Sequence, residues 1–232
     1  MRRPVLEEWS RGDSWLHCAD PRSKLIAVLV VLVFLGTSRA RPAQLAAEYL
    51  PVILLGLGGS GLPPWGVTKR VLAVMTFSAA FSAAAWIAGQ PERAGLLLTK
   101  SALSSYAILL FAGTTPLPGI LRSLEWLGAP RLLVQTTQFL YRYLFVLVAK
   151  ARQMRAAALC RGGFRWESAG GAAAALFGSA YGRAEGSHRA MLSRGAAGHI
   201  ASPPWQRPEA ASVGLPCALA LYLTGARLLW NL

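Results

Sequence analysis

Long apolar stretches separated by short polar segments make up the first half of the chain. Four of them cover residues 25–38, 45–57, 71–88 and 95–113, and a fifth covers residues 210–229. A membrane-crossing helix needs about 20 mostly apolar residues, and these stretches approach or reach that length. The pattern therefore predicts an all-α polytopic membrane protein with about five transmembrane helices.

The pattern changes between residues 116 and 209. Residues 120–127 are amphipathic, as expected of a helix lying on a surface. Residues 132–161 predict one long helix whose first half is apolar and whose second half is basic, and residues 172–194 predict another. We therefore expect an N-terminal segment (1–24), a four-helix membrane region (25–115), a region of long helices (116–209) and a C-terminal span (210–232).

Charged residues are scarce and unevenly placed. The chain is 54% hydrophobic and only 15% charged, with a net charge of +14, whereas soluble domains carry about 25% charged residues. With the N-terminus inside and four helices crossing, 19 of the 24 basic residues fall on the cytoplasmic side, as the positive-inside rule requires. In an alternative arrangement residues 132–149 also cross the membrane, which weakens this asymmetry but agrees with the hydropathy.

The residues that could carry chemistry are scattered along the sequence. Three cysteines and three histidines form no group with metal-ligand spacing, and no glycine-rich loop for binding phosphate is present. The basic residues lie beside apolar stretches without interleaved aromatic residues, which argues against nucleic-acid binding. We therefore expect a non-catalytic membrane subunit with no cofactor and no metal site. The alternatives are a self-sufficient carrier, which needs polar groups inside the membrane, and a lipid-phosphate enzyme, which needs clustered carboxylates.

The third and fourth apolar stretches are rich in alanine and serine, mainly within residues 78–85 and 101–105. Small side chains let helices approach closely in lipid, where the hydrophobic effect does not drive association. These residues therefore predict close packing, either between the two helices themselves or, alternatively, against another membrane protein.

A short repeat marks the ends of the two long helices. Residues 150–162 and 183–195 match at five of thirteen positions, and both copies end in a small residue, an arginine and a glycine. The two ends are Cys160-Arg161-Gly162 and Ser193-Arg194-Gly195. A glycine beyond a helix can turn the chain sharply, which leaves the arginine at an exposed tip. Two such tips could dock into two equivalent acidic grooves of a dimeric partner, although basic residues followed by glycine are also a routine way to end a helix.

The second long helix also carries a glycine stripe. Gly178, Gly182 and Gly186 recur at four-residue spacing, so they share one helical face. Each glycine costs about 1 kcal/mol of helix propensity relative to alanine. A close crossing by another helix would offset that cost, and the helix over residues 132–161 is the expected partner.

Several of these motifs together resemble the transmembrane T component of an energy-coupling-factor (ECF) transporter, the CbiQ/EcfT family. The resemblance covers about residues 13–230 and is strongest to the branch that serves cobalt and nickel uptake. The matching motifs are residues 20–25, residues 129–131, residues 141–147 and the two arginine-glycine ends. Where the family usually has alanine before each arginine, Cys160 and Ser193 stand here, and both are small.

The resemblance implies a role in transport. A T component of this family has several membrane spans and long cytoplasmic coupling helices, and lies in the bacterial or archaeal inner membrane. By carry-over, Arg161 and Arg194 would contact two ATP-binding-cassette ATPases, and the membrane part would hold a substrate-binding S component, CbiM-like in the cobalt and nickel branch. The implied substrate is cobalt or nickel, with vitamin transport through other S components as the alternative.

Overall fold

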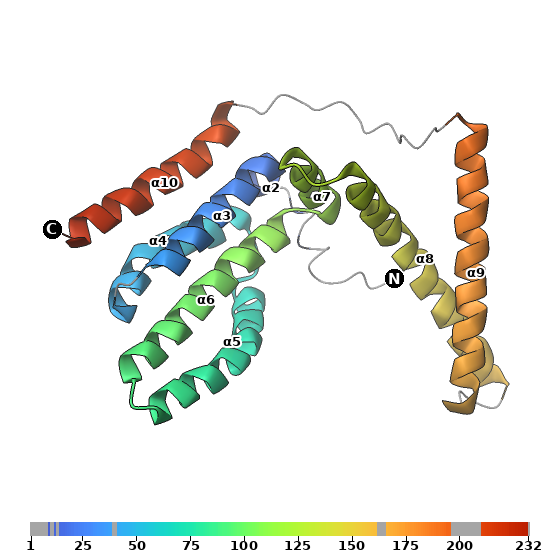
Figure 1. Cartoon of the computed structure of the whole chain (residues 1–232), viewed down its shortest axis with the longest axis horizontal. Coiled ribbons are helices and arrows are strands. Elements are labelled where there is room, and N and C mark those ends of the chain that lie inside the picture. Colours follow the sequence, from blue (N-terminus) through green and yellow to red (C-terminus); the bar gives the residue numbers. More distant parts are fainter. Residues whose placement is uncertain are drawn as a thin grey trace. The chain divides into compact units, whose positions relative to one another are not determined.

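The computed structural model describes residues 14–38, 41–161, 166–195 and 210–231, together with residues 9 and 12. Every regular element within these ranges is a helix, which confirms the predicted all-α fold (Figure 1). The helices are α2 (Trp15–Cys18), α3 (Pro21–Thr37), α4 (Pro42–Ser60), α5 (Pro64–Ile87), α6 (Pro91–Thr114), α7 (Leu117–Trp126), α8 (Arg131–Cys160), α9 (Trp166–Ser193) and α10 (Ala210–Asn231). They form two compact units, one from residues 1–127 and 207–232 and the other from residues 128–206.

The helices begin where proline fits the first turn. Pro21, Pro42, Pro64 and Pro91 each occupy the first position of a helix, where the missing backbone N–H costs nothing. The predicted start of α3 is confirmed in detail, because the Asp20 side chain accepts a hydrogen bond from the backbone N–H of Arg22 at 3.1 Å.

The first unit is built around α6. This helix packs against α5 on one side and against α3 and α4 on the other, and α10 packs against α3 (Figure 1). One apolar core joins α3, α4, α6 and α10, and a second lies where α4, α5 and α6 meet. The first contains Val31, Leu35, Leu45, Tyr49, Leu103 and Leu223, and the second contains Leu62, Val67, Val71 and Leu110.

Small residues allow the close pairing of α5 and α6. Ser82 of α5 is buried and donates a hydrogen bond to the carbonyl of Ala94 in α6 at 3.0 Å. Ala94 itself is also buried. The prediction that the small residues pack the two helices together is therefore confirmed at Ser82, whereas Ala79 and Ala83 lie on an exposed face of α5.

Two basic residues in the first unit bind the C-terminal end of α3. The ammonium of Lys100 donates to the carbonyl oxygens of Gly36 at 3.1 Å and Ser38 at 2.7 Å. The guanidinium of Arg227 donates to the Ser38 hydroxyl at 2.9 Å and to the carbonyl of Phe34, whose ring it also covers. The last carbonyls of a helix lack partners within the helix and carry partial negative charge. The two cations therefore tie α6 and α10 to the end of α3.

The opposite ends of these helices are also joined. The Ser14 hydroxyl donates to the carbonyl of Ser60, the last residue of α4, at 2.9 Å. The ammonium of Lys24 donates to the carbonyl of Thr114, the last residue of α6, at 3.2 Å. The N-terminal segment, the end of α4 and the end of α6 therefore lie on one side of the first unit, as expected if α3 to α6 cross back and forth.

Three described helices are long and apolar enough to cross a membrane, namely α5, α6 and α8. The first two correspond to the third and fourth predicted spans. The helix α3 has 17 residues. A helix that crosses a bilayer needs about 20 residues, so α3 is slightly shorter. Because α8 meets the same criterion as α5 and α6, its composition supports the alternative arrangement in which residues 132–149 lie in the membrane.

Candidate functional site

The second unit consists of the long helices α8 and α9. As predicted, α8 is continuous over 30 residues from Arg131 to Cys160. The helix α9 begins at Trp166, six residues before the predicted start, and runs to Ser193. The helix therefore includes Gly170 and Gly171, although glycine has a low helix propensity. The four alanines that follow at residues 172–175 offset this cost, because alanine has the highest helix propensity.

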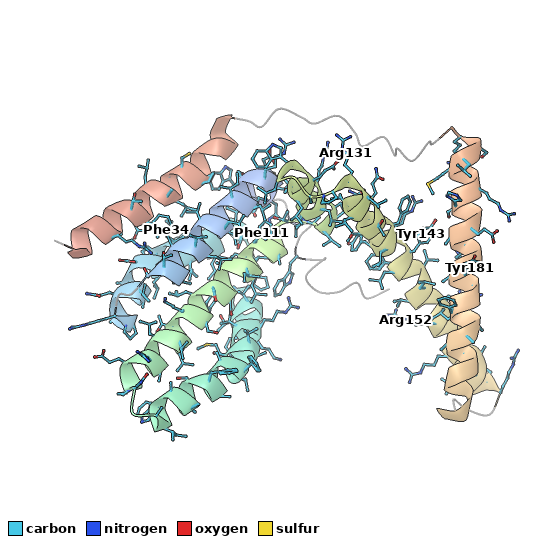
Figure 2. All side chains as sticks on the ribbon, in the orientation of Figure 1. Phe34, Phe111, Arg131, Tyr143, Arg152 and Tyr181 are labelled. Atoms are coloured by element: carbon cyan, nitrogen blue, oxygen red, sulfur yellow. The ribbon has the colours of Figure 1, made fainter. Side chains whose placement is uncertain are left out.

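A tyrosine connects the two helices. Tyr143 of α8 extends toward α9 (Figure 2), and its hydroxyl lies 2.5 Å from the hydroxyl of Ser187, so the two share a hydrogen bond. Residues 141–147 form one of the motifs that carry the family resemblance. The spacing of these residues does not predict a contact with Ser187. The bond fixes the separation of α8 and α9 far from the last residue of α8 and the first residue of α9.

The first predicted tip lies at the end of α8. The backbone N–H of Arg161 donates to the carbonyl of Ala158 at 3.1 Å, which tightens the last turn. Arg161 and the preceding Cys160 are both exposed. Gly162, predicted to turn the chain after this arginine, lies outside the described residues.

The second predicted tip lies at the end of α9. The backbone N–H groups of Arg194 and Gly195 donate to the carbonyls of Met191 and Leu192 at 3.1 and 3.0 Å. Gly195 has a φ of 73°, in the left-handed region where a side chain is strained. This is the glycine turn that the sequence predicts after Arg194. Arg194 and Ser193 are exposed on its outer side.

Both arginine side chains lie at the surface of the second unit. Within the described ranges, no hydrogen bond or ion pair engages either the Arg161 or the Arg194 guanidinium. An exposed guanidinium offers five N–H donors in a fixed planar arrangement that matches a carboxylate. The site can therefore bind acidic groups.

The two tips are far apart. Arg161 lies five residues before Trp166, the first residue of α9, and Arg194 follows its last residue. The 28 residues of α9 span about 42 Å at 1.5 Å per residue. Figure 1 shows α9 running away from the end of α8. Two arginines at this separation cannot enter one binding groove, so the geometry suits two separate sites.

The glycine stripe of α9 faces open space within the described residues. A Cβ atom added at Gly178, Gly182 or Gly186 would meet nothing within 4 Å. The contact between Tyr143 and Ser187 bridges the two helices with a long side chain and needs no close backbone approach. The stripe therefore stays a predicted crossing surface that the described part of α8 does not fill.

Apolar side chains form an exposed strip along the same unit. On α8, Leu133, Leu140, Leu144 and Val148 are exposed and lie on one side of the helix, since they are seven and four residues apart. Phe177 and Tyr181, four residues apart on α9, are also exposed. A large exposed apolar surface indicates contact with lipid or with another protein. Across the described residues, no group of His, Cys, Asp and Glu could hold a metal ion.

Comparison with known proteins gives one family match. A family model described as CbiQ, cobalt transport protein, matches residues 12–203. The matched range includes α3 to α9 and both arginine tips. No curated protein matches the chain.

Proposed function

The chain belongs to the CbiQ family of cobalt transport proteins, and on this premise we propose that it is the T component of an ECF-type cobalt or nickel importer. In this role it hydrolyses no ATP and binds no metal itself. It transmits motion from two ATPases to a separate, CbiM-like S component that binds the ion. Vitamin transport through a different S component is the alternative substrate assignment.

The observation that carries the proposal is the pair of exposed arginine tips. The helix α9, whose 28 residues span about 42 Å, lies between Arg161 and Arg194 in the chain. Two identical ATPases present two equivalent grooves, and a chain with two separated tips of like sequence can engage one groove with each. The small residues Cys160 and Ser193 leave room beside each arginine, and both are exposed.

The rest of the second unit suits the transmission of motion. A helix is stiff along its axis, and the hydrogen bond between Tyr143 and Ser187 makes α8 and α9 move together. The apolar strip of α8 and α9, which includes Leu140 and Phe177, offers the S component a surface that either ATPase can displace. Displacement of this strip after ATP binding would tilt the S component and release its ion.

Charge reversal at the tips tests the proposal. The double variant R161E/R194E should remain in the membrane but lose co-purification with the ATPases. Truncating a buried, hydrogen-bonded charge at an interface costs about 2–5 kcal/mol, and about 1.4 kcal/mol changes affinity tenfold. The control R155E/R183E makes the same charge change at exposed positions on the same two helices and should retain the ATPases. Retention by the tip variant, or equal loss from both variants, would contradict the assignment.

A further inference from the structure

The first unit contains a partly open apolar cavity that the proposed transport role does not use. Its volume is ≈490 Å³, and it is lined by residues of α2, α3, α4, α6 and α10. The walls are mainly aliphatic and aromatic side chains, among them Val28 of α3 and Ile53 of α4. Phe111 of α6, which Figure 2 labels, also lines the cavity. A volume of this size lies within the range of about 300–1,000 Å³ that is typical of sites for small ligands.

The length of the cavity matches half of a bilayer. Along α6 it is lined from Leu103 to Thr114, and 11 residue steps correspond to about 16 Å. The hydrocarbon core of a bilayer is about 30 Å thick, so each leaflet contributes about 15 Å. The cavity is therefore long enough for the acyl chain of a lipid in one leaflet.

One end of the cavity carries a buried cation. Lys24 lines the cavity and is only 5% exposed. Its ammonium donates to the carbonyls of His17 at 3.3 Å and Thr114 at 3.2 Å, and an ammonium has three N–H donors. Burial lowers the pKa of Lys24 to about 8, although Cys18 and Asp20 act in the opposite direction. An anion at this end would add both a hydrogen-bond acceptor and a compensating charge.

The polar end of the cavity coincides with the end of α6, where α7 begins one residue after Pro116. Lys24 thus stands where the apolar part of the first unit stops, at the level of the lipid headgroups. We propose that this cavity is a phospholipid site, in which an acyl chain lies between α3, α4, α6 and α10 and the anionic phosphate accepts a hydrogen bond from Lys24.

Photo-crosslinking of the full chain in phosphatidylcholine vesicles tests the proposal. The probes are phosphatidylglycerol and phosphatidylcholine that carry a diazirine in the middle of an acyl chain. We expect phosphatidylglycerol adducts on the α6 peptide that contains Ala107 and on the α10 peptide that contains Ala218, both of which line the cavity. If the exposed face of α5 is labelled as strongly as the cavity peptides, the probes report only the surrounding lipid. That result would overturn the proposed site.

Two variants fill the cavity and a third serves as a control. A107F and A218F each add a ring inside the cavity from a different helix and should lower the cavity adducts at least fivefold. A83F adds the same ring at an exposed position of α5 and should leave them unchanged. Circular dichroism shows which of the two cavity variants keeps its helical structure. If labelling of the cavity is undiminished in such a folded variant, the proposal is overturned.

The headgroup preference is tested at Lys24. In the wild-type chain phosphatidylglycerol should label the cavity about tenfold more than phosphatidylcholine. Both phosphates can accept the hydrogen bond from Lys24, but the choline ammonium of phosphatidylcholine repels the charged lysine, and a tenfold preference corresponds to about 1.4 kcal/mol. K24M should remove this preference while labelling by phosphatidylcholine persists. Equal labelling by the two lipids in the wild-type chain would overturn the assignment of an anionic lipid. None of these results depends on the ATPases.

Discussion

Removing the hydroxyl of Tyr143 should loosen the connection between α8 and α9. The hydroxyl groups of Tyr143 and Ser187 lie 2.5 Å apart and are partly buried. A hydrogen bond of this kind contributes about 0.5–1.5 kcal/mol net, which corresponds to a factor of about 2–12 in the population of the paired arrangement. Y143F, S187A and the double variant form a cycle whose coupling energy should fall in that range.

Spin labels at Gln153 of α8 and Ala190 of α9, both exposed positions, report the pairing as a distance distribution. The native cysteines are free and exposed, so they are first replaced by serine. We expect Y143F and S187A to broaden the distribution similarly, and the double variant to add little further. ATP-driven uptake by the complete transporter should fall in parallel. A coupling energy near zero, with uptake unchanged, would refute the role of this bond in transmitting motion.

Three further predictions concern the ends of helices. R227L should lower the melting temperature of the purified chain, because each charge-assisted hydrogen bond that Arg227 makes to the end of α3 contributes about 1.5–3 kcal/mol; R93L, at an exposed residue, is the control, and equal shifts would contradict the account. G195A should destabilise the last turn of α9 by roughly 1–2 kcal/mol, because the φ of 73° at Gly195 is left-handed. Hydrogen exchange should show that this turn opens more often in G195A. The control G182A adds a methyl group in open space and should not increase opening. Burial lowers the pKa of Lys24 to about 8, so the side chain is mostly charged below pH 8 and mostly neutral above it. The preference for phosphatidylglycerol should therefore weaken from pH 7 to pH 9. A preference that rises over this range would contradict the assignment of Lys24.

The sequence predicts the helices well because their signals are local. Asp20 and Pro21 mark the start of α3 by hydrogen-bonding rules that involve neighbouring residues only. Gly195 ends α9 for an equally local reason, since glycine tolerates the left-handed conformation. The arginine tips could be located because they depend on these helix ends and on a repeat visible in the sequence.

Contacts between distant residues could not be predicted in the same way. Lys100 and Arg227 appear in the sequence as isolated charges in apolar stretches, and only the fold shows that both bind the end of α3. The contact of Tyr143 with Ser187 depends on how α8 and α9 are aligned, which no periodicity specifies. The helix α9 begins earlier than predicted, before Gly170 and Gly171. These glycines lower the local helix propensity, but they do not mark the start of the helix because alanines follow them.

The central claim is that each arginine tip engages a different ATPase. A photo-crosslinking amino acid placed at both Cys160 and Ser193 preserves Arg161 and Arg194 and labels whatever lies beside them. In the assembled transporter, we predict that one chain captures two ATPase subunits at once, seen as a covalent complex of one T component with two ATPases. Capture of a single ATPase by both positions, or of none, would contradict the claim.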